Sequence, residues 1–91
     1  MSFQLGRVVW TRYINDCVAE NTQFAKFVMD SLARHCMGDW GEITESDKFE
    51  NDFSLDKHLR LFSVYKKDKF VIWVITEADR SVTTVLFPAE Y

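Results

Sequence analysis

Phe70-Val-Ile-Trp-Val-Ile-Thr76 is the stretch of this chain that decides its fold. Read with a period of two, it has apolar side chains on both faces, which is typical of a central β-strand that is covered on each side. Residues 59–65 precede it with the same period, and residues 82–87 follow it after a turn at residues 78–81. Both flanking runs are rich in β-branched and aromatic residues. The last third of the chain is therefore predicted to be an antiparallel three-stranded meander.

The N-terminal segment predicts one more strand and a short helix. We expect a strand over residues 3–10, in which Gly6 indicates a bulge or a close approach of two backbone segments. Thr11 can cap a helix that follows this strand. Asn21 or Thr22 can end that helix and cap the next one.

Two further helices are predicted before the meander. Over residues 24–36 the apolar side chains follow the i, i+3, i+4 spacing of a helix laid on a core, and Gly38 stands where a left-handed stop is expected. Thr44-Glu-Ser-Asp47 has the pattern of a capping box that opens a third, acidic helix. Three apolar side chains are expected to hold that helix against the core: Phe49, Phe53 and Leu55.

The resulting element order is β-α-α-α-β-β-β. Helices gathered before a run of strands predict an α+β fold with the helices on one face of the sheet. A chain of 91 residues has the length of one domain, so residues 1–91 are taken as a single α+β domain. Its eight Phe, three Trp and three Tyr provide an aromatic-rich core.

The lack of a recognisable targeting signal and the pattern of the cysteines predict a cytoplasmic protein. No basic region followed by a long apolar run begins the chain, which argues against a signal peptide, and no apolar stretch is long enough to span a membrane. The two cysteines, Cys17 and Cys36, have no C-x-x-C spacing and fall on helical apolar faces. We expect both to be reduced.

The acidic residues are concentrated in the middle of the chain. Residues 39–58 carry seven acidic and two basic side chains, whereas residues 59–91 carry four and five. The net charge of −3 argues mildly against direct binding of nucleic acid, because phosphate contacts need a surplus of Lys and Arg.

Several segments, spread over nearly the whole chain, carry a resemblance to a known family. They are Leu5-Gly6, Ala33-Arg34-His35, Gly38-Asp39-Trp40-Gly41, Asn51, Arg60, Ser63-Val-Tyr65, Trp73-Val-Ile-Thr-Glu-Ala-Asp-Arg-Ser81, Thr83-Thr84 and Pro88-Ala-Glu-Tyr91. With these segments the chain resembles the small "plasmid-related" proteins of bacterial plasmids and other mobile elements. The resemblance implies a bacterial, mobile-element setting. It implies no activity and no functional residues.

The element order also resembles that of RelE-type messenger RNA interferases, which gives a catalytic hypothesis. Such metal-independent ribonucleases need a general base, cationic groups for the phosphorane and a proton donor. The candidate residues for these roles are His35, Arg60, Tyr65, Glu77 and Arg80. Simpler interpretations stay open: Arg34 and His35 can cap the last carbonyls of their helix, and Glu77 and Arg80 can form an ion pair or turn hydrogen bonds.

The acidic segment gives the preferred hypothesis, a non-enzymatic module that binds a protein partner. A row of carboxylates on a helix can imitate duplex phosphates and so occupy the basic cleft of a nucleic-acid-handling or defence protein of the host. The candidate partner-binding residues are Asp39, Trp40, Glu42, Glu45, Asp47, Glu50 and Asp52. Trp40 is either an exposed anchor for the partner or a plug between helix and sheet, and the carboxylates are otherwise a solvated helix face.

Other chemistry has little support in the sequence. It contains no Gly-rich phosphate loop, no G-x-S-x-G elbow and no H-E-x-x-H motif, so no cofactor and no metal site are predicted. A strand at the edge of the sheet is a candidate for homodimerisation. The lysines at 66, 67 and 69 would protect one turn of the sheet from unwanted pairing.

Overall fold

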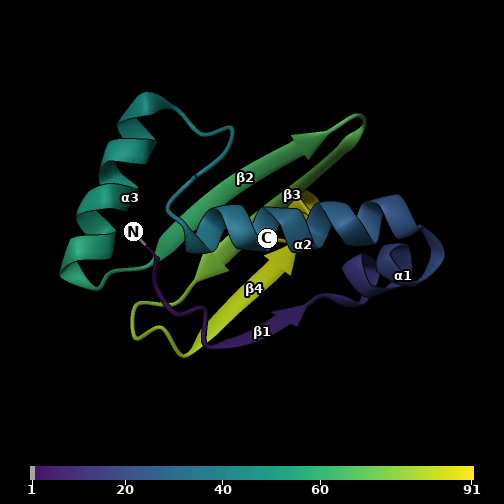
Figure 1. Cartoon of the computed structure of the whole chain (residues 1–91), viewed down its shortest axis with the longest axis horizontal. Helices are drawn as coiled ribbons and strands as arrows, with labels where there is room; N and C mark the ends of the chain where they lie inside the picture. Colours follow the sequence, from purple (N-terminus) through teal and green to yellow (C-terminus); the bar gives the residue numbers. More distant parts are fainter. Residues whose placement is uncertain (1) are drawn as a thin grey trace.

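The computed structural model describes residues 2–91, which form a four-stranded sheet with helices packed against it (Figure 1). The strands are β1 (Arg7–Trp10), β2 (Leu61–Lys67), β3 (Phe70–Thr76) and β4 (Val82–Leu86). The helices are α1 (Arg12–Glu20), α2 (Thr22–Cys36) and α3 (Glu45–Lys57), followed by a short 3-10 helix, η1 (Pro88–Glu90). The predicted α+β fold and its element order are confirmed.

The strand order is β1-β4-β3-β2, so the predicted central strand β3 lies inside the sheet. β3 pairs antiparallel with β2 from Leu61↔Thr76 to Lys67↔Phe70, and antiparallel with β4 on its other side. β1 adds to the meander as a parallel neighbour of β4, with Arg7 opposite Val82. The sheet is therefore mixed, with β1 and β2 as its two edges.

The first strand is shorter than predicted, because the backbone turns at Gly6. Gly6 has a φ of 67°, and a Cβ at this position would collide with the carbonyl of Arg80. Residues 3–5 therefore run outside the strand, and the amide of Phe3 donates to the carbonyl of Cys36 at the end of α2 (3.1 Å). The close backbone approach predicted for this glycine is present.

Local capping explains where α1 and α2 begin. The hydroxyl of Thr11 accepts a hydrogen bond from the amide of Ile14 (3.3 Å) at the start of α1. Asn21 ends α1 with its backbone amide, which donates to the carbonyl of Cys17 (3.0 Å), and its side chain opens α2 by accepting hydrogen bonds from the amides of Gln23 and Phe24. After α2, Gly38 has the predicted positive φ, 82°.

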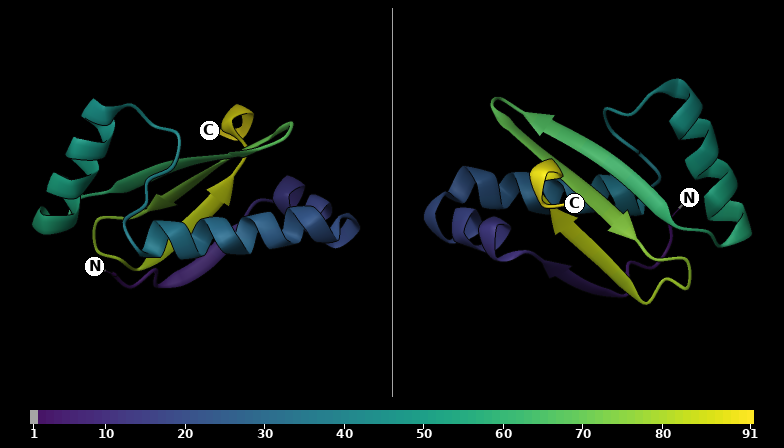
Figure 2. Two further views of the ribbon diagram at one scale, coloured as in Figure 1. Left: turned by 45° about the horizontal axis from the view of Figure 1, so that its top comes forward. Right: turned by 180° about the vertical axis from the view of Figure 1, so that it is seen from behind.

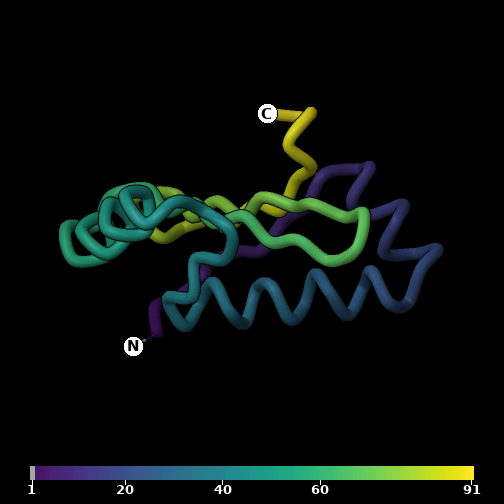
Figure 3. The backbone as a smooth tube through the Cα atoms, turned by 90° about the horizontal axis from the view of Figure 1, so that it is seen from above, coloured from purple at the N-terminus to yellow at the C-terminus, as the bar shows by residue number. Residues whose placement is uncertain are grey.

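Helix α2 lies across one face of the sheet, and η1 stands on the opposite face (Figures 2 and 3). Buried side chains of α2 meet buried side chains of the strands in one core, which contains Ile14, Phe24, Phe27, Val28, Leu32, Tyr65, Ile72, Val74 and Val85. No helix among residues 2–91 has the length and apolar character that crossing a membrane requires.

Helix α3 lies beside strand β2, at the edge of the sheet (Figures 1 and 3). Thr44 caps it as predicted, since its side chain accepts from the amide of Asp47 (3.1 Å). The prediction that phenylalanines hold this helix on the core is wrong, because Phe49 is 75% exposed and Phe53 is 51% exposed. The buried residue of α3 is Asn51.

Candidate functional site

The five candidate ribonuclease residues do not meet in one site. His35 and Tyr65 are fully buried between the sheet and α2. Arg60 and Glu77 lie on the opposite face of the sheet, because side chains alternate along a strand. Arg80 occupies the turn between β3 and β4. A general base and a phosphate clamp are therefore not brought to the same place.

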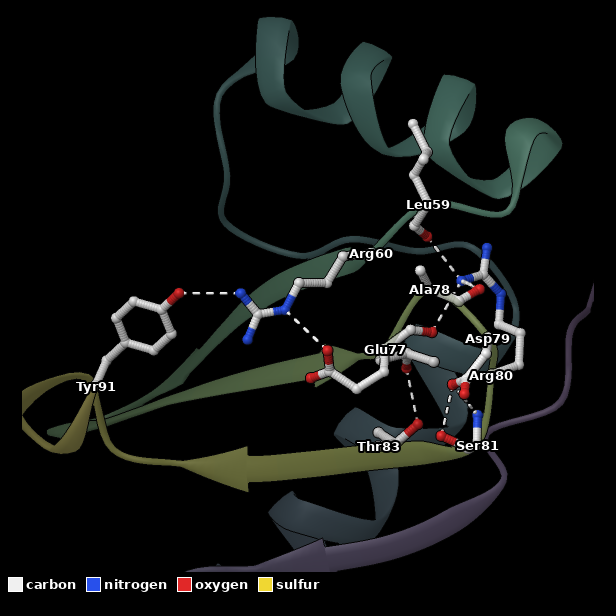
Figure 4. A network of polar contacts seen from close by, with 10 residues as sticks. Leu59, Arg60, Glu77, Ala78, Asp79, Arg80, Ser81, Thr83 and Tyr91 are labelled. Atoms are coloured by element: carbon white, nitrogen blue, oxygen red, sulfur yellow. Dashed lines mark hydrogen bonds and ion pairs between the residues drawn. The ribbon is translucent and has the colours of Figure 1, made fainter.

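Arg60 and Glu77 form part of a small surface network (Figure 4). The Nε atom of Arg60 lies 3.5 Å from a carboxylate oxygen of Glu77, and its Nη1 atom donates to the hydroxyl of Tyr91 (3.1 Å). The hydrogen bond to Tyr91 and the charge of Glu77 raise the pKa of Arg60. Arg60 and Tyr91 border a shallow hollow of about 290 Å³ that Phe62 and Trp73 also line.

Arg80 is a structural clamp, as the turn interpretation predicted. Its guanidinium donates to the carbonyls of Leu59 (2.7 Å), Glu77 (3.1 Å) and Ala78 (3.1 Å), and to the carbonyl of Ser54 near the end of α3 (3.2 Å). A cation at the end of a helix also meets the negative end of the helix dipole. Arg80 therefore joins α3 to the β3–β4 turn, and these donors are occupied by the backbone.

His35 lies inside a buried chain of hydrogen bonds that links α2 to three strands. Its Nδ1 atom is 2.6 Å from the hydroxyl of Ser63, and its Nε2 atom is 2.8 Å from the hydroxyl of Thr76. The chain continues to the hydroxyl of Thr83 (2.7 Å), which donates to the carbonyl of Leu5 (2.6 Å). Neither imidazole nitrogen caps the helix, so the capping interpretation of His35 is wrong.

The end of this chain fixes the donors from Thr83 back to Nε2 of His35. A carbonyl can only accept, so Thr83 donates to Leu5, and Thr76 must donate to Thr83. Thr76 then accepts from Nε2–H of His35, and in the neutral imidazole Nδ1 accepts the hydroxyl proton of Ser63.

The surroundings of His35 favour the same neutral form. Burial, together with the positive charge of Arg80, lowers the pKa of His35 to about 4. A histidine with no exposed surface and both ring nitrogens engaged has no access to a substrate.

The neighbouring Arg34 also binds a side chain instead of the carbonyls at the end of α2. Its Nε and Nη2 atoms contact the two carboxylate oxygens of Asp39 at 2.7 and 3.1 Å, and its guanidinium lies over the ring of Tyr65 (4.8 Å). The hydrogen bond from Arg34 lowers the pKa of Asp39. The hydroxyl of Tyr65 donates to the backbone carbonyl of Asp39 (2.6 Å), and burial raises the pKa of Tyr65. Both candidate residues, Asp39 and Tyr65, thus build the link after α2.

Trp40 is a plug rather than an exposed anchor. It is 3% exposed, its ring lies edge-on to the ring of His35 (5.5 Å between centroids), and its Nε1–H donates to a carboxylate oxygen of Asp52 (2.9 Å). Trp40, which was predicted to bind a partner, is therefore engaged within the fold, whereas Asp52 accepts this hydrogen bond and is still exposed. Together they join the link at residues 38–41 to the middle of α3.

The same link pairs with the outer edge of β2. The amide of Glu42 donates to the carbonyl of Val64 (2.7 Å), and the amide of Val64 donates to the carbonyl of Trp40 (3.3 Å). This approach requires a glycine between them: Gly41 has a φ of 77°, and a Cβ there would collide with the carbonyl of Val64.

Asn51 completes the cover of this edge from the side of α3. Its Oδ1 atom accepts from the amide of Phe62 (3.2 Å), and its Nδ2–H donates to the carbonyl of the same residue. The asparagine amide thus replaces a neighbouring strand. Through Asn51, Trp40 and Arg80, α3 is attached to the sheet at three places.

The outward face of α3 combines aromatic rings with carboxylates. Phe49 and Phe53 are four residues apart, so they lie next to each other on one side of the helix, opposite Asn51. Exposed carboxylates surround the pair on the same helix: Glu45, Glu50, Asp52 and Asp56. We call Phe49, Phe53 and these four carboxylates the α3 surface.

The acidic part of the α3 surface was predicted from the sequence, and the aromatic pair was missed. Among the predicted partner-binding carboxylates, Glu45 has a side chain that is 92% exposed. Glu42, Asp47 and Glu50 are also exposed. An apolar i, i+4 pair usually marks the packed side of a helix. The contrary signal was Asn51, a polar residue placed on the side that meets the sheet.

A cleft adjoins the α3 surface between the helix and the end of α2. It has a volume of about 540 Å³ and is lined by Met37, Gly38, Asp52, Leu55, Asp56 and His58. Met37 is 61% exposed, so the cleft offers an apolar wall beside two carboxylates. Within residues 2–91, no three side chains of His, Cys, Asp or Glu stand close enough together to hold a metal ion.

Comparisons with known proteins give this chain no relative. No family model matches it, and no curated protein and no solved structure is significantly similar to it. The resemblance to plasmid-related proteins therefore stays a prediction, and the function has to be argued from the α3 surface itself.

Proposed function

We propose that this protein is a binding module that docks on a protein partner through the α3 surface. The observation that carries the proposal is the exposed pair Phe49 and Phe53, held among carboxylates on a helix that is fixed to the sheet. The matching partner has an apolar groove with a basic rim, into which one face of a helix can fit.

The exposure of the two rings supports this proposal energetically. Burying a phenylalanine side chain stabilises a complex by roughly 1.5–3 kcal/mol, and aromatic residues are frequent hot spots of interfaces. Phe49 and Phe53 make little use of that energy within the chain, because they are 75% and 51% exposed.

The carboxylates support the choice of a basic partner. Helix α3 carries five acidic and two basic side chains, and its lysines, Lys48 and Lys57, lie 3.8 Å from Glu45 and Asp56. The surplus of carboxylates would steer a positively charged surface toward the two rings and repel acidic proteins. For a mobile-element protein, such a partner would be a nucleic-acid-handling or defence protein of the host, whose basic cleft the helix would occupy. The rigid attachment of α3 supports this as well, since a preorganised surface loses less entropy on binding.

Binding to immobilised protein tests the proposal. The wild type is compared with a Phe49→Ala/Phe53→Ala variant for capture of proteins from a bacterial lysate, followed by affinity measurement with each purified candidate. We expect the double variant to lose at least about tenfold in affinity, because it gives up the apolar contact of two rings. Wild-type binding should weaken steeply with added salt.

Tyr13→Ala provides the matched control, because Tyr13 is an aromatic residue that is 65% exposed on α1. It should bind as the wild type does. Equal affinity of the Phe49→Ala/Phe53→Ala variant and the wild type would contradict the proposal, as would an affinity that does not respond to salt. Ribonuclease activity is not proposed, because its candidate residues are buried or separated.

A further inference from the structure

The outer edge of β1 leaves backbone hydrogen-bonding groups without partners in the sheet. The amides of Arg7 and Thr11 donate to the carbonyls of Ser81 (2.9 Å) and Val85 (3.2 Å) in and beside β4. Because backbone groups alternate in direction along a strand, those of Val8 and Trp10 point away from β4. Figure 1 shows β1 at the margin of the fold, with no helix or strand of residues 2–91 beyond it.

An apolar groove runs beside this free edge, on the side of α2. It has a volume of about 540 Å³, and its lining is uncharged: Leu5, Val8, Trp10, Met29, Leu32, Ala33 and Cys36. Met29 is 58% exposed and Val8 is 38% exposed. The edge therefore offers backbone donors and acceptors next to exposed apolar side chains.

We propose that a second copy of this chain covers the edge, with the two β1 strands pairing antiparallel around a two-fold axis at Val9. In this register Val8 of one copy faces Trp10 of the other, and each pair exchanges two backbone hydrogen bonds. The two sheets become one continuous sheet. The two grooves meet across the axis, so that the α2 helices cover each other's Met29.

Two observations favour a second copy over a different protein: the self-compatibility of the groove and the covered opposite edge of the sheet. In a two-fold interface the same surface meets itself, so it must be self-complementary. An uncharged groove next to alternating backbone donors and acceptors meets this requirement. Like charges at its two ends weaken this pairing, because Arg7 of one copy would lie opposite Thr11 and next to Arg12 of the other, whereas the two copies of Arg7 would lie about 14 Å apart along the strands. The other edge of the sheet is already covered at Phe62 and Val64, so pairing stops at two copies instead of growing into a fibre.

A cysteine at the proposed axis tests the register directly. Val9→Cys is made in a background in which Cys17 and Cys36 are replaced by Ala, and the folded protein is oxidised and run on a non-reducing gel. Val9 faces its own copy in a non-hydrogen-bonded pair, where side chains come close enough for a disulfide. We expect a covalent dimer to form at least tenfold faster than in the control.

The control is Val64→Cys in the same background. It places the same residue type on the same face of the sheet, at the covered edge. Equal rates of cross-linking for Val9→Cys and Val64→Cys would overturn the proposal.

Val8→Pro tests the pairing by removing one outward amide. The amide of Val8 has no partner within the sheet, so the fold should survive, which circular dichroism checks. Light scattering should give twice the chain mass of 10.7 kDa for the wild type and the single mass for the variant. A wild type that is monomeric at the highest soluble concentration overturns the proposal, and the edge would then be open to another protein. If the variant fails to fold, the cross-linking result decides.

Discussion

The two edges of the sheet differ in how their backbone groups are satisfied. At the β2 edge, the link at residues 38–41 pairs with Val64, and Asn51 pairs with Phe62. At the β1 edge, Val8 and Trp10 have no such neighbour among residues 2–91. The difference shows that segments without any strand pattern, a glycine-bounded link and one helical asparagine, decide which side of a sheet is closed to further pairing.

The largest effect is expected when the closed edge is forced open at Gly41. Gly41→Ala places a Cβ against the carbonyl of Val64 in a backbone with a φ of 77°. We expect a loss of about 3 kcal/mol or more in the free energy of unfolding, from the collision and the broken pairing. Denaturant titration measures it. Gly38→Ala, at a φ of 82°, is the control and should cost about 1 kcal/mol.

Acid should lower the stability of the fold, because His35, which joins α2 to the sheet, has to take up a proton. The pKa of His35 is about 4 in the folded chain and about 6.5 when it is unfolded, so between these values the unfolded chain binds more protons. Stability is therefore full above about pH 6.5 and falls as the pH drops toward 4, by roughly 3 kcal/mol in total. Denaturant titrations between pH 7 and pH 4 measure this slope.

His35→Gln is the control for that slope, because it removes the titrating group while keeping an amide that can donate and accept. The variant should be less stable at pH 7 and should lose less stability on acidification. A slope identical to that of the wild type would show that other groups cause the acid sensitivity.

A matched pair of prolines compares the two edges directly. The amide of Val64 donates to the carbonyl of Trp40, whereas the amide of Val8 points outward. Val64→Pro should cost about 2–3 kcal/mol, because it removes this hydrogen bond and leaves the carbonyl unpaired. Val8→Pro should cost less than about 1 kcal/mol. Both are measured by thermal unfolding in dilute protein, and equal losses would contradict the comparison.

The smallest effect is expected for single side chains on α3. Asn51→Ala removes both hydrogen bonds to Phe62 and should cost about 2 kcal/mol, with faster hydrogen exchange at the amide of Phe62. Glu50→Ala, one position away on the exposed side, should change stability by less than about 0.5 kcal/mol. If the two variants behave alike, Asn51 is not what closes the edge.

The sequence predicts those parts of the fold that depend on neighbours in the chain. The meander follows from its period of two, and the helix starts follow from Thr11, Asn21 and Thr44, whose side chains accept from amides two or three residues on. The parallel pairing of β1 with β4 could not be predicted, because no local pattern links strands so distant in sequence.

The candidate site was less predictable for the same reason. His35 forms hydrogen bonds with Ser63 and Thr76, which belong to two different strands. No spacing in the sequence predicts this chain of hydroxyl groups. Phe49 and Phe53 were misplaced because an apolar pair on a helix normally faces a core. The exposed carboxylates of α3 could be predicted, since charge clusters are rarely buried.

The free edge and the α3 surface lie at opposite sides of the sheet, since β1 and β2 are its two margins (Figure 1). In a dimer joined at β1, the two α3 helices would therefore lie at opposite ends of one continuous sheet. A ligand with two matching grooves would meet both ends at a fixed span, and its second contact would form at high effective concentration. Such a protein would measure the distance between sites on its target, and ligands with a different spacing would gain no avidity.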